Sequence, residues 1–60
     1  MENTYYAIEK INKLYVVKKV IKRTSATPAS PAFRSVEAAQ NYADNKGYKI
    51  EKIGDLYEIL

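Results

Sequence analysis

The feature that most constrains the fold is a short sequence that occurs twice, 42 residues apart. Residues 6–17 read YAIEKINKLYVV and residues 48–59 read YKIEKIGDLYEI, so seven of the twelve positions are identical. Each copy places a two-residue turn candidate between apolar residues, Asn-Lys at 12–13 and Gly-Asp at 54–55. Asparagine tolerates a positive φ angle, and Gly-Asp suits a turn that has glycine first. The repeat therefore predicts two β-hairpins, over residues 5–21 and 48–59.

A two-residue turn also fixes the pairing register, which decides the side chains that share a face of the sheet. The rule pairs Ile11 with Leu14 and Ile8 with Val17. One face is then continuous and aromatic, and we expect it to form the core: Tyr6, Ile8, Tyr15, Val17, Tyr48, Ile50, Tyr57 and Ile59. The reverse face is also apolar, and we expect a protein interface there, made by Ile11, Leu14, Val16, Ile53 and Leu56.

Two different segments lie between the repeat copies. Residues 22–34 are small and polar and contain two prolines, which is typical of a flexible loop. Ser35 is a candidate N-cap, and residues at helical spacing continue to Gly47, a candidate left-handed C-cap. We therefore expect a helix over residues 36–46 that packs on the tyrosine face. The order is ββαββ in a single small α+β domain, residues 1–60, with an antiparallel sheet whose strand order stays open.

The composition argues against an enzyme. The 60 residues contain no cysteine and no histidine, which excludes a disulfide scaffold, a zinc finger, a thiol nucleophile and an imidazole base. No serine stands in a nucleophile-elbow pattern. Glu9 and Glu51 occupy equivalent repeat positions, but they lack a third ligand for a metal and fit solvent-facing strand positions. We expect no catalytic residue, no cofactor, no metal and no small-molecule substrate.

The chain also shows no sign of a membrane or secretory segment. No run of residues approaches the roughly 20 apolar positions needed to cross a membrane. The first four residues, Met-Glu-Asn-Thr, are too acidic and polar for a signal peptide. We therefore expect a cytoplasmic protein that has no membrane partner.

The net charge of +3 is unevenly distributed along the chain. Residues 1–34 carry seven basic and two acidic side chains, whereas residues 35–60 carry three and five. A basic rim around the expected loop could neutralise the phosphates of a nucleic acid; its members are Lys18, Lys19, Lys22, Arg23 and Arg34. Only two of the ten basic residues are arginines, and no nucleic-acid-binding signature is present. Nucleic-acid binding is therefore the alternative function.

Protein binding is the function that we expect first. An eleven-residue helix is about 16 Å long and about 10 Å wide, whereas a four-stranded sheet is about 19 Å wide. The remaining surface could be covered by Phe33 with the 22–34 segment, by a protein partner or by a second copy. A core of this size rarely supplies more than about 3–5 kcal/mol, which favours a two-fold homodimer. We expect a small non-catalytic regulator or inhibitor, of bacterial or phage origin, that acts on a protein partner.

Overall fold

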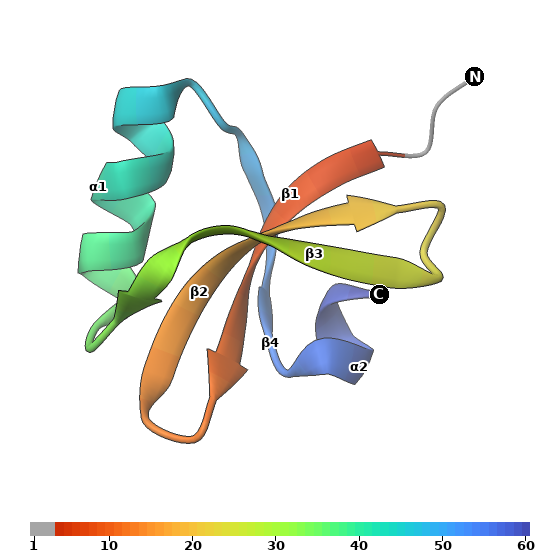
Figure 1. The fold of residues 1–60 in the computed structure, drawn as a ribbon, viewed down its shortest axis with the longest axis horizontal. Coiled ribbons are helices and arrows are strands. Elements are labelled where there is room, and N and C mark those ends of the chain that lie inside the picture. Colours follow the sequence, from red (N-terminus) through yellow and green to blue (C-terminus); the bar gives the residue numbers. More distant parts are fainter. Residues whose placement is uncertain (1–3) are drawn as a thin grey trace.

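The computed structural model describes residues 4–60 and consists of a four-stranded sheet with two short helices (Figure 1). The elements are β1 (Thr4–Ile11), β2 (Leu14–Ile21), β3 (Ser25–Phe33), α1 (Val36–Lys46), β4 (Ile50–Gly54) and α2 (Leu56–Ile59). The strand order is β3-β2-β1-β4, with β1 antiparallel to β2 and parallel to β4. The expected α+β class and single small domain are confirmed, although the sheet is mixed. Residues 1–3, which entered the argument against a signal peptide, lie outside the described range.

The first hairpin has the register that its sequence predicts. Ile11 pairs with Leu14 and Ile8 pairs with Val17, across the two-residue turn. Asn12 takes a φ angle of 56°, a left-handed conformation that asparagine adopts more readily than most residues. The turn therefore fixes which side chains of β1 and β2 share a face.

The helix is also where the sequence predicts it. The Ser35 hydroxyl accepts a hydrogen bond from the Ala38 N–H at 3.1 Å, and Gly47 ends the helix with a φ angle of 79°. Helix α1 covers the tyrosine face as expected, and we call this face the α1 face. Its core consists of Ile8, Val17, Ala39 and Ala43, packed against Tyr6, Tyr15, Ala29, Phe33, Tyr42, Tyr48 and Ile50. The alanines allow α1 to approach the sheet closely.

The expectation of a flexible loop over residues 22–34 is wrong, because most of this segment forms β3. Prolines are tolerated in β3 because it is an edge strand, where a missing N–H can face away from the sheet. The pairing shifts between Val16 and Lys18, so that residues 29–31 lie opposite Val17. There the Ser30 hydroxyl accepts a hydrogen bond from the Val17 N–H at 3.0 Å and replaces a backbone partner. Phe33 at the end of β3 closes part of the core under α1.

The expectation of a second hairpin over residues 48–59 is also wrong. These residues form β4, which pairs in parallel with β1, and the short helix α2. The Asp55 carboxylate accepts a hydrogen bond from the Glu58 N–H at 2.9 Å, and the Glu58 carboxylate accepts one from the Asp55 N–H at 3.0 Å. This reciprocal capping box starts a helix at the position where the repeat suggested a turn.

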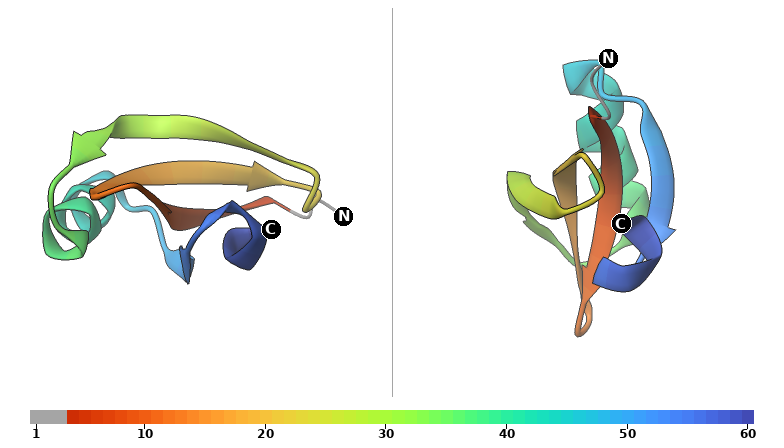
Figure 2. Two further views of the ribbon diagram at one scale, coloured as in Figure 1. Left: turned by 90° about the horizontal axis from the view of Figure 1, so that it is seen from below. Right: turned by 90° about the vertical axis from the view of Figure 1, so that its right-hand side faces the viewer.

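Helix α2 packs on the other face of the sheet, which we call the reverse face (Figures 1 and 2). Ile59 is fully buried there against Ala7 and Val20. The Tyr5 hydroxyl donates a hydrogen bond to the carbonyl of Ile59 and anchors the end of the helix. Tyr57 is 89% exposed, so its expected place in the core is wrong. Ile59 is a core residue as expected, but on the opposite face.

Replacing Ile59 with alanine tests the docking of α2. Because Ile59 is fully buried, Ile59→Ala is expected to lower the free energy of unfolding by about 2–4 kcal/mol in urea denaturation. Tyr57→Ala is the control from the same helix and is expected to change it by less than about 0.5 kcal/mol. Equal losses for the two variants would contradict the packing of α2 and favour the hairpin, in which both side chains share a face.

Candidate protein interface

The centre of the candidate interface is an ion pair on the reverse face. The Lys18 ammonium lies 3.2 Å from the Glu9 carboxylate, and the two side chains are only 16% and 12% exposed. The buried carboxylate oxygen Oε1 of Glu9, which faces Lys18, accepts no hydrogen bond of good geometry. Electrostatic attraction therefore holds the two side chains together. Glu9 is buried because β1 has a strand on each side, which corrects the solvent-facing position expected for it. Glu51, its equivalent in the repeat, is exposed and lies 4.0 Å from Lys49.

The ion pair can be predicted from the pairing register of the first hairpin. Lys18 is paired with Ala7, two residues before Glu9, so Lys18 and Glu9 are diagonal neighbours on one face. Diagonal neighbours on adjacent strands are close enough for long side chains to meet. The ion pair therefore follows from the same register that places Ile11 beside Leu14.

Exposed apolar side chains lie close to the ion pair. Some come from the same two strands, β1 and β2, and another comes from α2. Ile11 and Leu14 form the last cross-strand pair of the hairpin, and each is 39% exposed. Gly54 pairs with Glu9, so α2 begins next to the ion pair, and its first residue, Leu56, is 41% exposed. Leu56 lies one helical turn before the buried Ile59 and hence on the same side of α2. We call this surface the reverse-face patch; it consists of Ile11, Leu14, Val16 and Leu56, of which Val16 is buried.

Ile53, the fifth residue expected at this interface, lies elsewhere. The parallel pairing of β1 and β4 places Ile53 opposite Ile8, whose side chain belongs to the α1 face. Its side chain is 51% exposed there. The hairpin rule assigned the wrong face because β4 pairs with β1 and not with residues 56–59.

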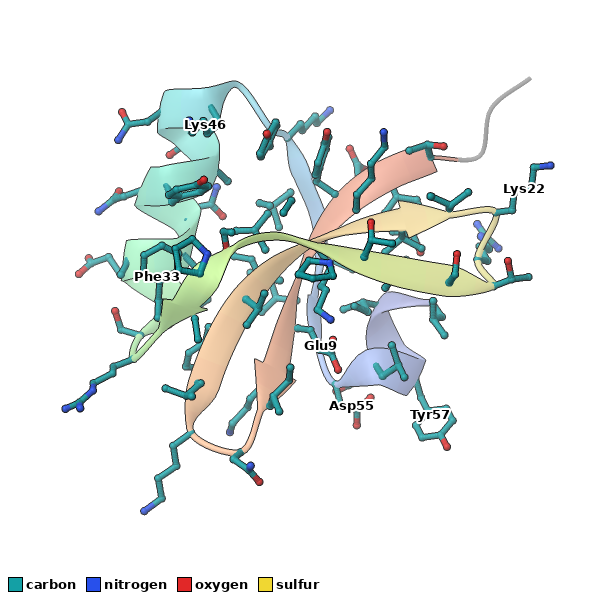
Figure 3. All side chains as sticks on the ribbon, in the orientation of Figure 1. Glu9, Lys22, Phe33, Lys46, Asp55 and Tyr57 are labelled. Atoms are coloured by element: carbon teal, nitrogen blue, oxygen red, sulfur yellow. The ribbon has the colours of Figure 1, made fainter. Side chains whose placement is uncertain are left out.

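The structure does not gather the expected basic rim into one surface. Lys22 lies at the turn before β3, and Phe33 marks the other end of that strand (Figure 3). A nine-residue strand is about 30 Å long, so β3 separates one end of the rim from the other. One lysine is also engaged by Glu9 on the reverse face. The five residues concerned are Lys18, Lys19, Lys22, Arg23 and Arg34.

Known proteins add no functional assignment. Comparisons with protein-family models, curated proteins and solved structures give no match. Within residues 4–60, no three acidic side chains lie close enough together to hold a metal ion. Over the same range, no helix is both long and apolar enough to span a membrane. The function is therefore inferred from the geometry of the chain itself.

Removing one member of the ion pair tests its burial. Lys18→Met leaves the Glu9 carboxylate in a poorly hydrated site without a counter-ion, and we expect the free energy of unfolding to fall by about 2–3 kcal/mol. The double variant Glu9→Leu with Lys18→Met removes both charges and is expected to recover most of this loss. Urea denaturation of the wild type and of both variants measures the effect. A double variant that is as unstable as Lys18→Met would contradict the role given to charge.

Proposed function

We propose that the protein is a non-catalytic binding module that acts on a protein partner through the reverse-face patch. The observation that carries the proposal is the exposure of Ile11, Leu14 and Leu56 close to a sequestered ion pair. Burying apolar surface contributes about 25 cal/mol per Å², so a partner that covers these side chains gains affinity. The Glu9–Lys18 pair is already formed within the chain, so a partner can cover it without leaving either charge unpaired.

A second copy of the chain is the partner whose chemistry matches this surface most directly. A two-fold interface brings the same patch of both subunits together. The leucines and isoleucines of both copies are then covered, while the Glu9–Lys18 pair of each copy stays within its own chain. The homodimer expected from the sequence is therefore part of the proposal, as is a cytoplasmic role as a small regulator or inhibitor.

Nucleic-acid binding receives less support from the arrangement of charges. The reverse-face patch is apolar and offers no row of cations for phosphates, which dominate nucleic-acid affinity. Of the basic residues expected to act together, Arg34 lies after β3, at the opposite end of the strand from Lys22 and Arg23. Protein binding therefore remains the first proposal and nucleic-acid binding the alternative.

Replacing Leu14 with lysine tests the proposed interface. We expect the wild type to sediment as a dimer at high micromolar concentration and Leu14→Lys to sediment as a monomer, because the added charge is buried only in the dimer. The double variant Leu14→Lys with Leu56→Lys is expected to be monomeric at every concentration tested. Ile53→Lys is the matched control, since it adds the same charge on the α1 face.

The outcome also separates a second copy from other partners. A monomeric wild type at high micromolar concentration would exclude the homodimer. A pull-down with the wild type, Leu14→Lys and Ile53→Lys would then test for another protein. A partner retained by Ile53→Lys and lost by Leu14→Lys supports the patch, whereas equal retention by all three proteins would contradict it.

A further inference from the structure

The turn between β2 and β3 is held in an unfavourable backbone conformation. Lys22 and Arg23 have φ angles of 54° and 58°, and the Thr24 N–H donates a hydrogen bond to the Ile21 carbonyl at 3.1 Å. Ile21 pairs with Ser25, so three residues form the loop, and Lys22 and Arg23 are the central residues of a β-turn within it. Two consecutive central residues with positive φ are typical of a turn that favours Asn-Gly. Two long basic side chains stand there instead. Backbone strain of this kind is often retained where the side chains have a function.

The second observation is an open cleft of about 340 Å³ beside this turn. Its lining comes from the turn, the start of β1 and the middle of β4: Thr4, Tyr5, Arg23, Glu51 and Lys52. The volume is at the lower end of the range for small-molecule pockets. None of these residues belongs to the reverse-face patch, so the cleft is independent of the proposed protein interface.

Lys52 is held in position on one side of the cleft. Its ammonium group lies 5.3 Å from the centre of the Tyr5 ring and 3.5 Å from a main-chain oxygen of Leu60. Tyr5 is itself fixed by the hydrogen bond from its hydroxyl to the Ile59 carbonyl. The ammonium thus needs little ordering when a ligand binds, which favours affinity.

Arg23 supplies the second cation. Among residues 4–60, its side chain makes no ion pair and no hydrogen bond, so its donors are available to a ligand. Among residues 4–60, Glu51 is the only acidic side chain in the lining, so the described side chains there sum to one positive charge. Arginine and lysine together are common phosphate-binding groups, and the forked guanidinium can bind two phosphate oxygens at once.

We propose that this cleft binds the phosphoryl group of a small phosphate ester, held between Arg23 and Lys52. Two cations attract an anion more strongly than Glu51 alone repels it. This net electrostatic attraction grows with the charge of the ligand, so it is larger for a doubly charged phosphate than for a carboxylate. Thr4 also lines the cleft, and a threonine hydroxyl group can donate a further hydrogen bond. The strained turn then has a physical reason: it presents Arg23 to the cleft.

Titration followed by NMR tests this site. We expect inorganic phosphate and adenosine 5′-monophosphate to shift the amide signals of residues 4–5, 22–24 and 51–52 in a saturable manner, while adenosine does not. Tighter binding of the nucleotide than of inorganic phosphate identifies an ester as the ligand. If inorganic phosphate and the nucleotide bind with equal affinity, the phosphate group alone accounts for binding. An ester would then be excluded as the preferred ligand.

Variants of the lining make the test specific. Arg23→Gln is expected to weaken binding about tenfold or more, since a hydrogen bond to a charged group is lost. Glu51→Gln is expected to tighten it severalfold by removing the repulsion. Arg34→Gln is the matched control, because it removes an arginine at the opposite end of β3. Shifts that do not saturate, or that respond equally to Arg23→Gln and Arg34→Gln, would overturn the proposal.

The turn itself provides a second test with an independent readout. Lys22→Asn with Arg23→Gly introduces the residues that this turn favours, and we expect the melting temperature to rise by roughly 4–8 °C. The same variant is expected to lose phosphate binding. A variant that is more stable and still binds phosphate with unchanged affinity would show that Arg23 has no part in the site.

Discussion

The rest of the structure depends on the burial of three consecutive residues in the middle of β1. Side chains alternate along a strand, so Ala7 and Ile8 point to opposite faces of the sheet, and both are fully buried. Ile8 anchors the cluster under α1, and Ala7 anchors the cluster under α2. Glu9 follows and is sequestered with Lys18. This pattern requires a strand on each side of β1 and a helix on each face, which is the arrangement observed.

Each helix covers its face only in part. Helix α1 contributes two alanines to the core, and the short α2 contributes Ile59. These contacts lie over the middle of the sheet, so apolar residues at the end of the hairpin, Ile11 and Leu14, stay partly exposed. The candidate interface is therefore a direct consequence of small helices on a sheet that is apolar on both faces.

The sequence allowed the first hairpin and α1 to be predicted because their signals are local. Asn12 determines one turn, and Ser35 and Gly47 delimit the helix. The second repeat copy was misinterpreted because its identities with the first concealed two decisive differences. Where the first copy has Lys13 and Val16, the second has an aspartate and a glutamate three residues apart.

Those two differences change the secondary structure. An aspartate followed three residues later by a glutamate is a capping-box pattern, whereas the first copy continues with β-branched residues. The signal for α2 is thus present in the sequence, although the identities with the first copy favour a second hairpin. The parallel pairing of β4 with β1 has no such local signal, because it depends on the path of the chain through α1.

The formation of a strand by the proline-containing residues of β3 changed the positions of the candidate site residues more than any other difference. Proline marks a loop by its missing N–H, but an edge strand with a bulge tolerates it, and here the Ser30 hydroxyl serves the Val17 N–H instead. Once residues 25–33 form a strand, the basic residues before and after it are separated. The same strand requires a tight turn before it, and this turn places Arg23 in the lining of the cleft that Lys52 of β4 also lines. The pairing that separates Arg34 from Lys22 and Arg23 thereby contributes to a cleft that is lined by two cations 29 positions apart in the sequence.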